Sequence, residues 1–347
     1  QPVSAARPCV KYIQTLHVSL LTIFGAVCRP NPFRAARVPG RLNWFLLKFY
    51  EGGRMFSTDV CGGHAVNFSI DKTRADGASY IYNNKPEERA ARMVLTIDIG
   101  NTNIVLGFLD GDDIIGTYRI TTKSNHTSDE YGLMITQFLA LSGLRPSDID
   151  DVIIASVVPK VMHSFRASII KFLNINPMVV GPGIKTGINI RIDDPKSLGS
   201  DCLADCVGAY YTYGGPVLVA DFGTATTFNY VNDEGVITCG LITTGIRTAA
   251  AALWGETAQL PEVEITKPKS ILATGTKTAM QAGLYYNFLG GIERTIAQFH
   301  KEIDEDFRVV ATGGLSRVFA DDTNMIDIYD PDLIFKGMRH IYDRNVR

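Results

Sequence analysis

The 347-residue sequence lacks the patterns that mark several common classes of protein. It contains no Gly-x-x-x-x-Gly-Lys-Thr run, which excludes a P-loop as the phosphate-binding device. None of its six cysteines forms a Cys-x-x-Cys pair, so neither a disulfide framework nor a zinc site is indicated. The histidines are scattered, and no Ser/His/Asp order indicates a hydrolase. The cysteine usage fits a reducing compartment, and we expect a cytoplasmic protein.

Long apolar runs and a strong net charge are also missing. The apolar stretch 20–27 falls short of the roughly 20 residues that a membrane-spanning helix needs. The net charge of −2 gives no argument for nucleic acid, so we expect neither a membrane nor a nucleic acid as partner. This balance hides a contrast between two regions. Residues 1–92 have 13 Lys and Arg against 6 Asp and Glu, a net charge of +7, whereas residues 93–347 have 21 against 30, a net charge of −9.

Residues 1–92 are difficult to interpret as a domain. Basic residues flank the apolar stretch 20–27, which is compatible with a signal or transit segment. We favour a second interpretation, in which Met93 is the natural start and residues 1–92 are upstream sequence that is read through. Regular patterning begins abruptly at Met93, and the first residue is Gln1 rather than Met. We therefore expect this extension to be non-native or poorly ordered.

The most informative feature that is present is a sequence motif that occurs twice. Asp98-Ile-Gly-Asn-Thr-Asn103 follows the apolar run 94–97, and Asp221-Phe-Gly-Thr-Ala-Thr-Thr227 follows the apolar run 217–220. Each continues as a second apolar run and a turn, which predicts two matching hairpins and a duplicated domain. A lone Asp-x-Gly turn is most often only a tight loop, but the repetition favours two loops that grip one polyphosphate. A third turn, Thr312-Gly-Gly314, follows a strand and would approach a sugar or base.

Alternating strands and helices elsewhere in residues 93–347 predict an α/β sheet structure. Ser128–Leu141 has helical spacing, with Ser128 as the expected N-cap. Further helices are expected over 161–172, 201–213, 248–256 and 278–299, and further strands over 151–158, 177–180 and 308–312.

These motifs carry a family resemblance. The sequence resembles the actin, sugar kinase and Hsp70 superfamily, and within it is similar to the type III pantothenate kinases. The resemblance covers nearly all of residues 93–347, and the motifs that carry it besides the two hairpin loops are Ser156-Val-Val-Pro159, Asp194-Pro-Lys196, Gly199-Ser-Asp201, Leu260-Pro261, Met280-Gln-Ala-Gly283 and Ala311-Thr-Gly-Gly314. It implies two duplicated actin-like (RNase H-like) domains, with mixed sheets flanked by helices, over residues 93–198 and 199–347.

The resemblance also implies a function. The activity would be ATP-dependent phosphorylation of the primary hydroxyl of pantothenate to 4'-phosphopantothenate, the first step of coenzyme A biosynthesis. Asp201 would be the catalytic general base. The enzyme would be a homodimer that uses Mg²⁺ and either K⁺ or NH₄⁺, with Asp98 near Mg²⁺ and Asp221 holding the monovalent cation.

The remaining site residues are implied in the same way. The residues matched to ATP binding are Asp98, Ile99, Gly100, Asn101, Thr102, Asn103, Ile104, Val105, Thr224, Gly313 and Gly314. The residues matched to substrate binding are Gly199, Ser200, Asp201, Cys202 and Thr276, the last of these acting across the dimer interface.

The sequence departs from the family pattern where the substrate would bind. Cys202 occupies the position of an arginine, Ile192 that of a tyrosine, and Thr244 that of a proline. A thiol cannot supply the charge or the planar donors of a guanidinium, although Arg191 and Lys196 are close in sequence. Two alternatives therefore stay open: a weakly catalytic nucleotide-binding paralogue with a regulatory, Bvg accessory factor-like role, or a kinase for another small alcohol. Asp201 itself could be no more than a helix N-cap.

Overall fold

The computed structural model describes residues 46–50, 54–61, 64–70 and 92–346. The chain divides into two compact units, residues 1–88 and residues 89–347. In the first unit the described residues form an antiparallel sheet of order β1-β2-β3, with β1 at Leu46–Tyr50, β2 at Arg54–Cys61 and β3 at His64–Ile70. The sequence did not predict these strands. Most of residues 1–92 lie outside the described residues, so the interpretation of this extension stays a prediction.

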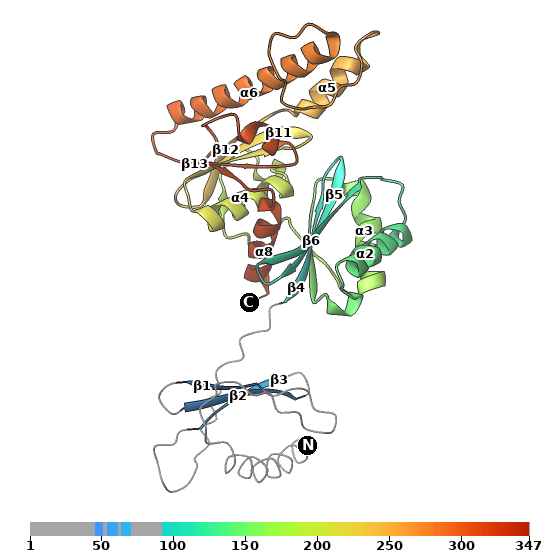
Figure 1. The fold of residues 1–347 in the computed structure, drawn as a ribbon, viewed down its shortest axis with the longest axis vertical. Helices are drawn as coiled ribbons and strands as arrows, with labels where there is room; N and C mark the ends of the chain where they lie inside the picture. The colour runs from blue at the N-terminus through green and yellow to red at the C-terminus, as the bar shows by residue number, and fades with distance from the viewer. Residues whose placement is uncertain (1–45, 51–53, 62–63, 71–91, 347) are drawn as a thin grey trace. The chain divides into compact units, whose positions relative to one another are not determined.

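The second unit begins with a five-stranded mixed sheet of order β6-β5-β4-β7-β8 (Figure 1). Its strands are β4 (Met93–Ile99), β5 (Asn103–Asp110), β6 (Asp113–Thr121), β7 (Asp151–Ser156) and β8 (Met178–Val179). The first three strands form an antiparallel meander, and β7 and β8 continue the sheet in parallel. Helices α2 (Ser128–Leu141) and α3 (Pro159–Leu173) cover its outer face. We call this sheet and its two helices the first lobe.

The second lobe repeats this strand order. Its sheet has the order β14-β13-β10-β11-β12-β9. Its strands are β9 (Asn189–Ile190), β10 (Val217–Phe222), β11 (Ala225–Val231), β12 (Val236–Thr244), β13 (Arg308–Thr312) and β14 (Ile328–Tyr329). The meander β10–β12 with parallel β13 and β14 matches β4–β8 strand for strand. The prediction of two duplicated actin-like domains with mixed sheets is therefore confirmed, while the boundary between residues 198 and 199 stays a prediction.

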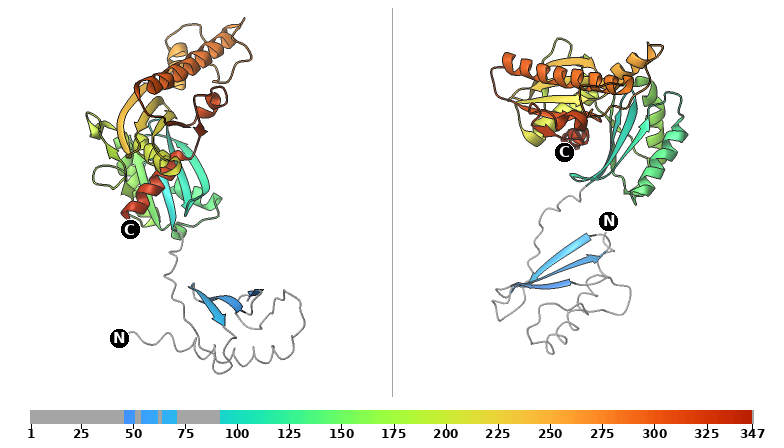
Figure 2. Two further views of the ribbon diagram at one scale, coloured as in Figure 1. Left: turned by 90° about the vertical axis from the view of Figure 1, so that its left-hand side faces the viewer. Right: turned by 45° about the horizontal axis from the view of Figure 1, so that its top comes forward.

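Helices α5 (Ile246–Gly255) and α6 (Thr276–Glu302) pack on the outer face of the second sheet, and Figure 2 shows α6 running across it. The short helix α7 (Ser316–Ala320) follows β13. Two single turns of 3₁₀ helix complete the lobes, at Pro146–Asp148 and Pro195–Ser197. Among the described residues, no helix combines the length and the apolarity needed to cross a membrane.

Two further helices fill the space between the lobes, α4 (Ser200–Tyr213) and α8 (Leu333–Asn345). One apolar core joins them to the inner faces of both sheets, through residues such as Val94, Val207, Val219 and Met338. The two helices pack closely because each has a glycine at the contact. A Cβ on Gly208 would lie 2.5 Å from the carbonyl oxygen of Leu333, which leaves no room for a side chain. This packing fixes α4, and with it the residues of its first turns, between the two sheets.

Candidate active site

Four aspartates approach one another where the two lobes meet. Asp98 and Asp221 are the last-but-one residues of the equivalent strands β4 and β10. Asp201 and Asp205 lie one turn apart on α4. Burial, followed by the charges of Asp201 and Asp221, raises the pKa of Asp98 to about 8. Burial and the charge of Asp201 raise the pKa of Asp221 to about 7, so carboxylates from both lobes and from α4 act on one another.

Two of these carboxyl groups have oxygens that no described residue satisfies. Oδ1 of Asp98 and Oδ1 of Asp205 are buried without a hydrogen-bond partner within residues 92–346. Burial, together with the charges of the other three aspartates and of Asp330, also raises the pKa of Asp205 well above its usual range. Buried carboxylates of one sign are costly unless a cation or proton joins them. Their oxygens are the ligand type that Mg²⁺ prefers, so the chemistry of the site fits a divalent cation.

The described residues do not form a complete protein cage for a metal. No group of three or more His, Cys, Asp or Glu side chains within the described ranges is arranged to hold an ion. Mg²⁺ is commonly bound by one or two carboxylates together with substrate phosphates and water. The site therefore suits a cation that arrives with a phosphorylated substrate.

The two hairpin loops that repeat in the sequence meet in the structure. Each has the same tight turn: Gly100 donates its N–H to the carbonyl of Asn103 at 3.0 Å, and Gly223 donates to that of Ala225 at 3.0 Å. The hydroxyl oxygens of Thr102 and Thr224 lie 2.7 Å apart, a hydrogen bond between the lobes. The structure thus brings the loop Asp98–Val105 and residue Thr224 together, and their predicted binding of ATP stays a prediction.

The third glycine turn lies against the second of these loops. Strand β13 runs parallel to β10 and pairs Thr312 with Asp221, so Gly313 comes next to the carboxylate. The φ angle of Gly313 is +90°, and a Cβ there would lie 2.2 Å from Oδ1 of Asp221. Only glycine fits this position. Gly314 follows as an exposed residue, so the Gly-Gly turn opens at the same site as both loops.

The predicted substrate segment is attached to the first lobe. The hydroxyl of Ser200 donates to the carbonyl of Ser156 at 3.0 Å and accepts from the Ser156 N–H at 2.8 Å. The N-cap of α4 is Gly199, so the alternative that Asp201 is the N-cap is wrong. Asp201 lies in the first turn and accepts the N–H of Cys202 at 2.8 Å.

Cys202 contributes no charge to the site. Its Sγ lies 3.7 Å from the hydroxyl of Thr227 on β11. Burial raises the pKa of the thiol, which keeps it neutral at physiological pH. Thr276, the implied substrate residue that lies on the second lobe, is the exposed first residue of α6. No described contact joins Thr276 to Asp201, and its expected contact across a dimer interface stays a prediction.

Two residues of the site were missed by sequence analysis. Asp205 is four residues after Asp201, and this spacing places both on one face of a helix. The sequence alone could therefore have indicated that Asp205 lies beside Asp201. Arg119 on β6 is paired with Val105, which is paired with Asp98, so its placement depends on strand register. Its charge is the one that lowers the pKa of Asp98.

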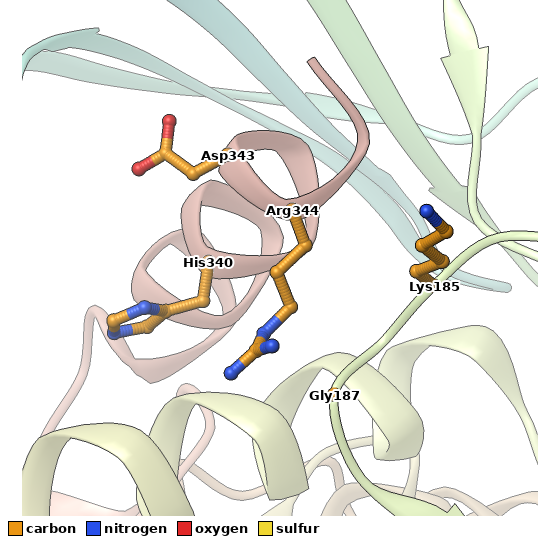
Figure 3. A pocket seen from close by; sticks show the side chains of 5 residues that line it. All are labelled: Lys185, Gly187, His340, Asp343 and Arg344. Carbon is orange, nitrogen blue, oxygen red and sulfur yellow. The ribbon is translucent and has the colours of Figure 1, made fainter. Parts of the chain in front are cut away.

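A separate pocket lies away from these residues, between the end of α8 and the loop before β9 (Figure 3). It has a volume of about 410 Å³ and is lined by Lys185, Gly187, His340, Asp343 and Arg344. The Arg344 guanidinium lies 4.5 Å from the ring centre of Tyr211, and Tyr211 donates its hydroxyl to the carbonyl of Gly187 at 2.7 Å. None of the predicted site residues lines this pocket.

Comparison with known proteins gives a consistent result. The family model of type III pantothenate kinases matches residues 94–298. A type III pantothenate kinase of Bifidobacterium adolescentis is 81% identical over 255 residues, which cover 74% of this chain and 100% of the relative. That of Agathobacter rectalis is 48% identical over 256 residues, 74% of this chain and 98% of the relative.

Solved structures give weaker likenesses. A Baf family protein from Campylobacter jejuni has a TM-score of 0.45 at 21% identity, over 73% of this chain and 98% of its own. The ROK hexokinase of Thermus thermophilus has a TM-score of 0.41 at 12% identity, over 73% of this chain and 99% of its own. Both are too distant to bear on function.

Proposed function

Because this chain belongs to the type III pantothenate kinase family, and is thus an enzyme that phosphorylates pantothenate, we propose that Asp201 is the general base of the transfer from ATP. The observation that carries this proposal is the convergence of Asp98, Asp201 and Asp221 beside the Thr102–Thr224 contact. Two phosphate-binding loops and one carboxylate on a separate helix provide what phosphoryl transfer requires.

In the proposed reaction, the loops Asp98–Val105 and Gly223–Thr224 hold the phosphates, and Gly313 and Gly314 approach the nucleoside. The primary hydroxyl oxygen of pantothenate forms a bond to the γ-phosphorus, the bond from that phosphorus to the β–γ bridging oxygen breaks, and ADP leaves. Asp201 accepts the hydroxyl proton. The main contribution of the protein is to position the two substrates and to neutralise charge.

We further propose that Asp98 lies beside Mg²⁺ and that Asp221 binds K⁺ or NH₄⁺. The unsatisfied buried oxygen of Asp98 and the raised pKa of both carboxyl groups support this assignment. Bound Mg²⁺ would offset the negative charge that the phosphates bring to the carboxylates. The side chains of Asp98 and Asp221 would then ionise without the cost of burying unpaired charge.

We also propose a homodimer formed through the second lobe. Four exposed apolar side chains support it, on α5, on α6 and on the loop between them: Leu253, Ile271, Leu272 and Tyr286. Leu272 is 83% exposed and is only four residues before Thr276, the residue expected to act across the interface. A contiguous exposed apolar patch on this part of the lobe would be typical of an interaction surface.

The kinase is proposed to consist of the domains 93–198 and 199–347, in the cytoplasm. The length of the relatives supports this assignment, since 255 residues of this chain match the whole of one relative, and residues 93–347 are 255 residues. Cys202, Cys206 and Cys239 are free thiols, which fits a reducing compartment.

The direct test is formation of 4'-phosphopantothenate from pantothenate and ATP, followed by mass spectrometry. We expect product to require Mg²⁺ and to increase with K⁺ or NH₄⁺ relative to Na⁺. Binding of ATP without any product from pantothenate would contradict the proposal and would favour the regulatory role or another alcohol.

A further inference from the structure

Strand register places Arg119 in one row with the aspartate of the first phosphate loop. Asp98 on β4 pairs with Val105 on β5, and Val105 pairs with Arg119 on β6. Residues that pair directly across neighbouring strands project to the same face of a sheet, and neighbouring strands lie about 4.8 Å apart. The side chains of Asp98 and Arg119 therefore emerge on the same face, two strands apart.

This face is the one that is directed toward the second lobe. Val105 packs against the core that α4 and α8 share with both sheets, whereas its neighbours Ile104 and Leu106 are buried against α2 and α3. Arg119 is exposed at the edge of this inner face. A Cβ built on Gly314 would lie 3.6 Å from Nη1 of Arg119, so the guanidinium reaches the Gly-Gly turn of the second lobe.

The guanidinium has no fixed partner in this position. Within residues 92–346 it forms no ion pair and no side-chain hydrogen bond, although its charge acts on Asp98. A guanidinium offers five N–H donors in a planar fork that matches phosphate oxygens two at a time. A cation that spans the space from the first phosphate loop to the Gly-Gly turn has the geometry to bind a chain of phosphates lying between them.

We propose that Arg119 binds the polyphosphate of the nucleotide from the side of the first lobe. This inference rests on the proposed use of ATP and adds a contact that the glycine loops cannot make. Backbone N–H groups contribute only partial charges, whereas Arg119 contributes a full positive charge beside Asp98. This charge would offset the repulsion between the nucleotide phosphates and those aspartates of the site that are ionised.

The test is calorimetric titration of the full chain with ATP, ADP and adenosine, without pantothenate. In Arg119→Gln we expect the affinities for ATP and ADP to fall by about ten- to a hundredfold, the range for a lost hydrogen bond to a charged group. The affinity for adenosine should not change, because adenosine has no phosphate. Arg119→Lys keeps the charge without the fork, and its affinities should lie between those of the wild type and Arg119→Gln.

Arg166→Gln is the matched control, because it removes the same charge from α3 instead of β6. Nη2 of Arg166 donates a hydrogen bond to Oδ1 of Asn176 at 2.8 Å. A second measurement needs no variant: ATP should protect Arg119 of the wild-type chain from modification by phenylglyoxal, and adenosine should not. Equal affinities of the wild type and Arg119→Gln for ATP would overturn the inference alone. An equal loss for adenosine would also overturn it, since the effect would not depend on phosphate. A wild-type chain that binds no ATP would overturn both this inference and the proposed function.

Discussion

The two lobes share the order of five strands but differ in the cross-strand row that begins at the equivalent aspartates. In the first lobe the row is Asp98, Val105 and Arg119, and in the second lobe it is Asp221, Thr227 and Ile242. The aspartate is the same in both, whereas the third position holds a cation in one and an apolar side chain that is 79% exposed in the other. Duplication thus fixed the place of the carboxylate and its loop, and later positions in the row diverged.

This difference separates the tasks of the lobes. In the proposed function, the first lobe combines the proposed phosphate loop with Arg119, which has no ion pair within residues 92–346, and this combination suits the charged end of a nucleotide. In the second lobe, Thr227 contacts Cys202 on α4, so the same row leads to the helix that carries Asp201. Helix α4 belongs to neither sheet, and in the proposed function its Asp201 carboxylate acts between two loops that hold the phosphates.

The largest effect on activity should follow from a substitution on α4, and not from one in the sheets of the two lobes. We expect Asp201→Asn to lower kcat by about 10²–10⁴-fold, the usual effect of losing a general base, because the amide cannot accept the hydroxyl proton. The affinity for ATP should be almost unchanged, since both phosphate loops remain. Kinetics of phosphopantothenate formation with parallel ATP titration measure both quantities. Asp129→Asn, in the exposed pair with Lys171, is the control. Near wild-type turnover in Asp201→Asn would show that the base is elsewhere.

A smaller effect should follow from restoring a cation beside the second lobe. Pantothenate has a carboxylate, and Cys202 supplies a neutral thiol at the position where the family resemblance implies an arginine. Cys202→Arg should lower the KM for pantothenate by about ten- to a hundredfold, with little change in the KM for ATP. If Arg191 or Lys196 already serves this purpose, their alanine variants should raise the KM for pantothenate and Cys202→Arg should not help. Three variants without any effect on pantothenate would contradict it as the substrate.

The equivalent aspartates should differ in how they couple stability to pH. The pKa values of Asp98 and Asp221 are raised to about 8 and about 7, so the folded chain holds protons that the unfolded chain releases near pH 4. The folded state binds more protons, and its free energy of unfolding should therefore fall as the pH rises from about 4 toward 7. The slope is about 1.4 kcal/mol per pH unit for each carboxyl group that stays protonated.

Of these two aspartates, only Asp98 should still contribute between pH 7 and pH 8, which separates the two lobes. Denaturant unfolding without Mg²⁺ should show that Asp98→Asn reduces the slope in this interval and that Asp221→Asn does not. Asp129→Asn again serves as the control. A wild-type stability that does not depend on pH from 5 to 8 would contradict the burial of these carboxyl groups.

Local sequence patterns predicted the elements of this fold that depend mainly on interactions between residues close in sequence. The hairpins and helices followed from apolar runs that end in Asp-x-Gly turns and from helical spacing. The cap of α2 was misplaced by one residue: Thr127 caps the helix instead of Ser128, because Glu130 must stand three residues after the cap to return the hydrogen bond. Arg119 could not be found in this way, since its role depends on a register that only the folded sheet sets. The short strands β9 and β14 likewise form through tertiary pairing.

The smallest effect should come from removing the chain that precedes both lobes. A chain that begins at Met93 should keep the kcat of the full chain, because residues 93–347 hold both rows, α4 and α8. Its Tm should fall slightly, since Arg92 binds Asp151 at 3.2 Å and accepts a hydrogen bond from Arg339 on α8 at 3.1 Å. A chain that begins at Arg92 is the matched control and should regain part of this loss. Thermal unfolding and the phosphopantothenate assay test both chains. If the shorter chain is insoluble or inactive while the full chain is active, the extension is part of the kinase. The two lobes alone would then not account for the activity.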